Sequence, residues 1–178
     1  MEKRMPSVRP EELINAVRFS SMETVKNLLA QGADVNGKDS IGNTALMYTA
    51  RRHDRIELAR LLLAAGARID EKSNDGNTAL ILASHSNNSG MVRFLLDNGA
   101  TLDSKNKSGY TALTIAESWG FTEIVRIIKD ATEGRRKLAA EKARRDAEKA
   151  RCDAANALAA QRQERLKRAR PSTALRPK

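Results

Sequence analysis

A repeat of 33 to 34 residues constrains the fold of this chain more than any other feature. The string GNTAL begins at Gly42 and again at Gly76, and the related string GYTAL begins at Gly109. A Gly–Ala pair returns with the same two steps, as Gly32–Ala33, Gly66–Ala67 and Gly99–Ala100. Two independent markers that keep one period indicate a solenoid, in which similar structural units stack on their neighbours.

Each period predicts two short helices followed by a polar turn. Thr44, Thr78 and Thr111 stand before apolar stretches and offer the hydroxyl that caps a first helical turn. Gly66 and Gly99 are expected to end the second helices, because glycine adopts the left-handed C′ conformation without a Cβ clash. Apolar residues at helical spacing mark those second helices: Ile56, Leu58, Leu61 and Leu62; Met91, Val92, Leu95 and Leu96; Ile124, Val125, Ile127 and Ile128.

This order of elements resembles the ankyrin-repeat family over about residues 10–133. The segments TALM, TALI and TALT stand where the family has Thr-Pro-Leu-His, so the family's proline and histidine are absent here. The resemblance implies an all-α solenoid of about four helix-turn-helix repeats with β-turn fingers. We expect full repeats at about 40–72, 73–105 and 106–133, after a degenerate first repeat that begins near Pro10. An extra residue is expected near Arg51–Arg55, between two helices.

The charge of the chain is concentrated after the repeats. Residues 1–130 carry 17 Lys and Arg against 16 Asp and Glu, whereas residues 131–178 carry 15 against 6. The Ala, Arg, Lys and Glu composition after residue 131 predicts a long charged helix that Pro171 stops, and Gly134 either interrupts or only weakens it. The expected parts are an N-terminal segment (1–9), the repeats (10–133), a basic helix (134–170) and a disordered tail (171–178).

Two questions about this C-terminal helix stay open. Its alanines alternate by three and four residues from Ala140 to Ala157, which is the spacing of a coiled coil. The helix is therefore either free or loosely docked on the repeats, or it lies against a partner, or it pairs with a second copy of itself. Its basic end either solubilises the chain or contacts nucleic acid or another anionic surface. Base stacking is excluded there, because no aromatic residue follows Phe121. The basic residues in question are Arg162, Arg165, Lys167, Arg168 and Arg170.

The sequence offers no pattern for catalysis, for a cofactor or for a metal. His53 and His85 have no companion cysteine cluster, and Cys152 is the only cysteine. No apolar run is long enough for a signal peptide or a membrane span. These features predict a monomeric protein of the cytoplasm without enzymatic activity.

The resemblance implies a binding surface on the turn fingers and on the concave face of the first helices. We therefore expect a protein-binding adaptor, with contact through the basic helix to nucleic acid or an anionic surface as the alternative. Tyr48 is expected in the core, and Trp119 either packs on the final turn or anchors a partner. The predicted partner-binding residues are Ile41, Asn43, Arg51, Arg52, Asn74, Asn77, His85, Lys107, Tyr110 and Trp119.

Overall fold

The computed structural model describes residues 9–168, and their side chains as far as Arg165. This part of the chain is all-helical and contains no strand. Its elements are α1 (Pro10–Phe19), α2 (Met22–Ala30), α3 (Ala45–Ala50), α4 (Ile56–Ala64), α5 (Ala79–His85), α6 (Ser89–Asp97), α7 (Ala112–Ser118) and α8 (Thr122–Arg168). The chain divides into two compact units, residues 1–132 and 133–178, and α8 begins in the first and continues into the second.

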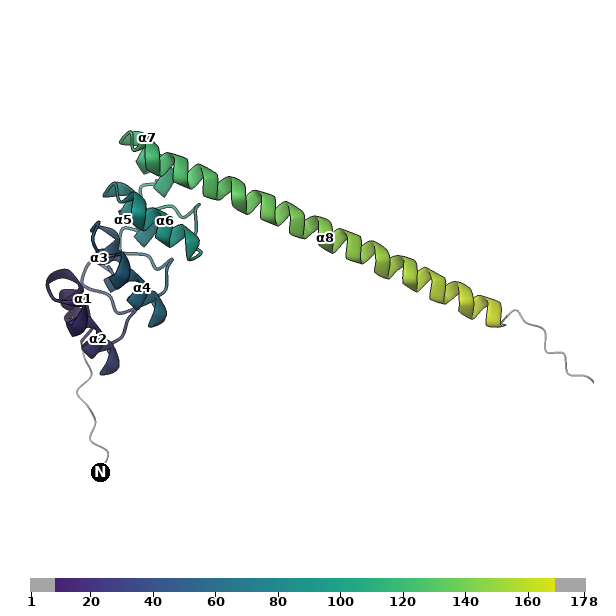
Figure 1. The fold of residues 1–178 in the computed structure, drawn as a ribbon, viewed down its shortest axis with the longest axis horizontal. Coiled ribbons are helices and arrows are strands. Elements are labelled where there is room, and N and C mark those ends of the chain that lie inside the picture. The colour runs from purple at the N-terminus through teal and green to yellow at the C-terminus, as the bar shows by residue number, and fades with distance from the viewer. Residues whose placement is uncertain (1–8, 169–178) are drawn as a thin grey trace, which may run out of the picture. The chain divides into compact units, whose positions relative to one another are not determined.

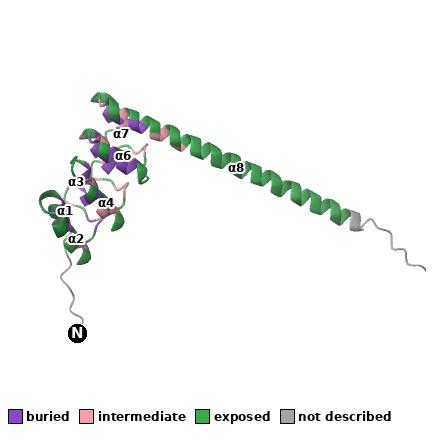
Figure 2. Cartoon of the chain, in the orientation of Figure 1, coloured by how far each residue is buried: buried purple, intermediate pink, exposed green. Residues whose placement is uncertain are grey.

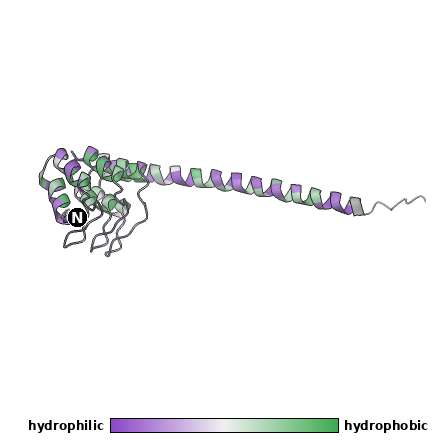
Figure 3. Ribbon diagram, turned by 90° about the horizontal axis from the view of Figure 1, so that it is seen from below, coloured by the Kyte–Doolittle hydropathy of each residue, from purple (hydrophilic) through white to green (hydrophobic). Residues whose placement is uncertain are grey.

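The first unit is built from two rows of helices (Figure 1). Helices α1, α3, α5 and α7 contact one another in succession, while α4 contacts α6 in the second row. The turns between repeats lie together on one side of the helices (Figure 3). Five residues, 51–55, join α3 to α4, whereas three residues, 86–88, join α5 to α6. The predicted solenoid is confirmed, and the extra residue of the second repeat lies in the longer linker.

The predicted helix ends are confirmed. The hydroxyls of Thr44, Thr78 and Thr111 accept hydrogen bonds from backbone N–H groups of the third helical residue, which is what an N-cap side chain does. Gly66 and Gly99 both have φ of 90°, the left-handed conformation that ends the second helices. Local sequence signals therefore fix where each helix begins and where it stops.

One apolar core runs through the first unit (Figure 2). Leu62, Leu95 and Ile128 occupy matching positions in successive repeats and are 0%, 0% and 2% exposed. Ile124 and Ile127, in the first turns of α8, are buried in the same cluster. The second helix of each repeat therefore contributes its apolar stripe to a continuous core, as the helical spacing predicts.

The last repeat has a polar outer face. Ala50 is buried in the second repeat, whereas its equivalent in the last repeat, Glu117, is exposed. Leu96 is 7% exposed, but its equivalent Lys129 is exposed. The Lys129 ammonium lies 3.1 Å from a carboxylate oxygen of Glu117. A polar outer face is what allows a terminal repeat to end a solenoid in water.

The second unit is helical throughout its described part. Helix α8 passes through Gly134 without a break, so glycine does not interrupt it. All side chains from Arg136 to Arg165 are exposed. Arg145 and Glu141 form an ion pair one helical turn apart, with 2.8 Å between nitrogen and oxygen. Residues 1–8, Pro171 and the predicted tail 171–178 lie outside the described residues.

Candidate protein-binding groove

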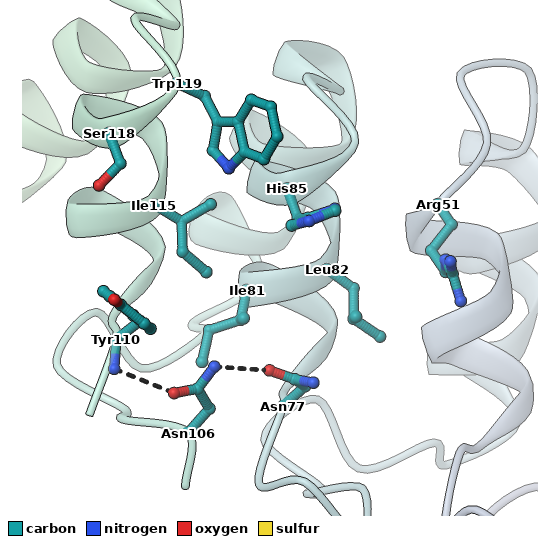
Figure 4. A pocket seen from close by; sticks show the side chains of 10 residues that line it. All are labelled: Arg51, Asn77, Ile81, Leu82, His85, Asn106, Tyr110, Ile115, Ser118 and Trp119. Carbon is teal, nitrogen blue, oxygen red and sulfur yellow. Dashed lines mark hydrogen bonds between the residues drawn. The ribbon is translucent and has the colours of Figure 1, made fainter. Parts of the chain in front are cut away.

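A groove of about 690 Å³ lies on the first unit, between α5, α7 and the neighbouring turns (Figure 4). We call it the α5–α7 groove. It brings together half of the predicted partner-binding residues, namely Arg51, Asn77, His85, Tyr110 and Trp119. Ser118, next to Trp119 at the end of α7, also lines it, whereas four further lining residues were not expected on this surface: Ile81, Leu82, Asn106 and Ile115.

The floor of the groove is apolar. Ile81 on α5 and Ile115 on α7 are 2% and 8% exposed, so they belong to the core and show only their edges to the groove. Leu82 is half-buried and lies between Ile81 and Arg51 in the view of Figure 4. An apolar floor supplies binding free energy whenever a ligand removes it from water.

Two aromatic side chains form the wall on the α7 side. Trp119, at the C-cap of α7, is 63% exposed, and Tyr110, on the last turn finger, is 50% exposed. The Trp119 ring makes an edge contact with His85, with 5.8 Å between ring centroids, and stacks on Phe121 at 6.4 Å. Trp119 is thus held by neighbouring rings while much of its surface stays open to solvent.

Paired asparagines hold the finger that carries Tyr110. The side-chain oxygen of Asn106 accepts the backbone N–H groups of Ser108 at 3.1 Å and Tyr110 at 2.9 Å. The Asn106 amide nitrogen donates to the side-chain oxygen of Asn77 at 3.0 Å (Figure 4). These bonds connect the fingers of successive repeats and fix the backbone from which Tyr110 projects.

The fingers are also joined through their backbones. The N–H of Asn74 donates to the carbonyl of Ile41 at 3.0 Å, and the N–H of Lys107 donates to the carbonyl of Asp75 at 2.8 Å. The Asn74 side chain adds a bond to the carbonyl of Ser40 at 3.1 Å. Asn74 and Lys107 are exposed but lie outside the lining of the α5–α7 groove. Asn74 therefore links the first two fingers to each other through hydrogen bonds.

Asn43 corrects one prediction. Asn43 is only 6% exposed, although the resemblance to ankyrin repeats implied an exposed position on a turn finger. Its backbone N–H donates to the carboxylate of Asp39 at 2.9 Å, and its carbonyl accepts the N–H of Asp39. At this exposure Asn43 offers almost no surface to a partner. Arg52 is exposed outside the groove lining, 3.6 Å from the carboxylate of Asp54.

Ile41 lies in a second, smaller hollow of about 470 Å³, the N-terminal groove. Tyr48 lines it too and donates its hydroxyl to Asp39 at 2.6 Å, so Tyr48 packs on the core but is not enclosed by it. The Arg18 guanidinium lies 4.8 Å from the centre of the Tyr48 ring. Because Glu11 and Asp39 also line this hollow, its charge is mixed.

The predicted basic residues lie in the second unit. Arg162 and Arg165 are exposed on α8. The side chains of Lys167 and Arg168, and the whole of Arg170, fall outside the described residues. Among the residues that the structure describes, no group of three or more potential metal ligands occurs, and no helix has the length and apolar character needed to cross a membrane.

Alignment of the three repeats with one another would have identified two of the groove residues that were not predicted, Leu82 and Ile115. Tyr48, Leu82 and Ile115 occupy the same position of three successive repeats, the inner face of the first helix. All three line a groove in the structure. Leu82 and Ile115 were not among the predicted partner-binding residues, although their position in the first helix is the one that faces the groove.

Comparison with known proteins agrees with this architecture. Residues 13–106 and 57–138 match the model of the family described as ankyrin repeats in three copies. A stretch of 47 residues is 45% identical to the mitochondrial disaggregase of Homo sapiens, which amounts to 26% of this chain and 7% of that protein. So short a match carries nothing over from the activity of the longer protein. The family match extends over most of the two helix rows, and this chain belongs to the ankyrin-repeat family.

Proposed function

We propose that the α5–α7 groove binds a segment of a partner protein and that Trp119 and Tyr110 anchor it. Ankyrin repeats are generally protein–protein interaction modules without catalytic activity. The observation that carries the proposal is the exposure of both aromatic side chains, 63% and 50%, beside an apolar floor within one groove. Tryptophan and tyrosine are enriched among residues that dominate binding free energy.

The arrangement favours slow dissociation of a bound segment. The rings of His85 and Phe121 already restrict Trp119, so less conformational entropy is lost when a partner covers it. Burying the exposed parts of both rings removes apolar surface from water. Changes at such anchors alter mainly the dissociation rate.

The test is surface-binding kinetics with a partner captured by cross-linking to the full-length chain. The double variant Trp119→Ala with Tyr110→Ala should dissociate about tenfold faster or more, since each factor of ten corresponds to about 1.4 kcal/mol. Phe19→Ala is the matched control, because Phe19 is 75% exposed but lies outside both grooves. Unchanged dissociation in the double variant would refute the proposal.

The basic part of α8 supports a second candidate function, contact with nucleic acid or another anionic surface. Its supporting observation is the charge excess after residue 130 together with the exposure of Arg162 and Arg165. Under our main proposal, truncation after Glu133 slows association modestly, because exposed charges act mainly on encounter. Under the second, truncation abolishes binding, and binding by the full chain weakens steeply as salt rises.

A further inference from the structure

The hydrogen-bonding groups of the α5–α7 groove show which kind of segment it fits. Asn106 accepts two backbone N–H groups with its side-chain oxygen, so its amide nitrogen must face Asn77. That nitrogen is a donor, and the Asn77 atom that meets it is therefore the side-chain oxygen. The remaining polar group of Asn77, its NH₂, has no hydrogen bond within the described part of the chain and lines the groove.

Two further donors line the same groove. Arg51 is exposed and forms no ion pair with any described residue, unlike its neighbour Arg52, which lies beside Asp54. The indole nitrogen of Trp119 can only donate, and Figure 4 shows it on the side of the ring that faces Ile115. Among the described residues that line the groove, none carries a carboxylate. The groove thus presents a cation and N–H donors without an anion of its own.

The spacing of these groups sets the length of a matching segment. Arg51 follows α3 and Trp119 follows α7, and α5 packs between those helices. Packed helices lie about 8–10 Å apart, so the two side chains start about 16–20 Å from each other. An extended peptide advances about 3.3 Å per residue and covers that distance in about five or six residues.

We propose that the α5–α7 groove binds an extended acidic segment, in which a large apolar side chain packs against Trp119 and an Asp or Glu about five residues away pairs with Arg51. This inference rests on the proposed function and adds the chemical class of the partner. The apolar residue covers the floor formed by Leu82 and Ile115. The carboxylate supplies the acceptors that Arg51 and the NH₂ of Asn77 lack.

Selection of random twelve-residue peptides on the immobilised full-length chain tests the inference. Recovered peptides should combine Phe, Leu or Trp with Asp or Glu at the stated spacing. Selection on Arg51→Glu should lose the acidic residues, whereas Arg52→Glu, with the same change of charge one residue away, should keep them. A chain in which Arg162, Arg165, Lys167, Arg168 and Arg170 are all replaced by serine should recover the same peptides, which excludes capture by these basic residues.

A double-mutant cycle by calorimetry completes the test. For one recovered peptide, Arg51→Ala and replacement of the peptide's Glu by Gln should each raise Kd about three- to tenfold, and the two changes together should do little more. Peptides that depend on Trp119 but carry no acidic residue would overturn the acidic class and leave groove binding standing. Recovered peptides indifferent to Trp119→Ala would overturn the proposed function itself.

Discussion

The two units of this chain obtain their helices by different means. In residues 9–132 the helices are short, of 6 to 10 residues where they lie wholly in that unit, and they depend on burial, with Leu62, Leu95 and Ile124 each 0% exposed. From Arg136 to Arg165 every side chain is exposed, and the helix rests on strong helix-forming residues and ion pairs along its surface. The same element type is a product of packing in one unit and of local propensity in the other.

The largest difference between the two units is expected when a leucine in each is replaced by alanine. Leu95→Ala should lower the free energy of unfolding by about 2–5 kcal/mol, because it leaves a cavity in the core. Leu158→Ala, on a side chain that is 69% exposed, should change it by less than about 0.5 kcal/mol. Chemical denaturation followed by far-ultraviolet circular dichroism measures both. Equal losses would mean that α8 has a packed face after all.

Glycine gives a comparison in which the two effects have opposite signs. Gly42 has φ of 77°, and a Cβ there would collide with Asn74 of the next finger, so Gly42→Ala should cost about 1–3 kcal/mol. Gly134 lies inside α8 with open space around it, so Gly134→Ala should stabilise the helix by up to about 1 kcal/mol. Unfolding curves of the two variants check this. Destabilisation by Gly134→Ala would show that the glycine is needed there.

The smallest expected effect concerns the ion pairs. Glu71 lies 2.8 Å from the ammonium of Lys38 and 3.1 Å from the guanidinium of Arg68, and these hydrogen bonds hold the pKa of the Glu71 carboxyl below its ordinary value of 4.5. A lowered carboxyl pKa stabilises the fold above about pH 4.5, and this contribution is lost as pH falls through the folded-state pKa.

Glu71→Gln should therefore lower the free energy of unfolding at neutral pH by less than about 1 kcal/mol. The difference from the parent chain should disappear in acid. Glu141→Gln removes a pair whose side chains are 59% and 77% exposed, and it should have a smaller effect at neutral pH. The free energy of unfolding, measured as a function of pH for the parent chain, Glu71→Gln and Glu141→Gln, tests both expectations. A Glu71→Gln deficit that persisted at low pH would point to a packing role for this side chain.

The sequence predicts the repeat architecture well because its signals are local. Thr44 caps a helix and Gly66 ends one whichever repeat lies next to them. The spacing of these residues along the sequence was therefore sufficient to predict the helix bounds. The burial of Asn43 was missed because it depends on how closely neighbouring turns approach, which the residue's own surroundings in sequence do not encode. The sequence predicts part of the groove. Its aromatic wall, Tyr110 and Trp119, was predicted, whereas Leu82 and Ile115 could not be distinguished by sequence from aliphatic core residues.

The position of Trp119 determines what an optical unfolding experiment would report. It is the only tryptophan of the chain, so all indole emission comes from the last repeat and from the groove. In a solenoid each repeat is held only by its neighbours, and the terminal ones open at lower free energy than the middle. Emission from Trp119 should therefore change at a lower denaturant concentration than the circular dichroism of the whole helical stack, and the gap between the two midpoints measures how independently the groove opens.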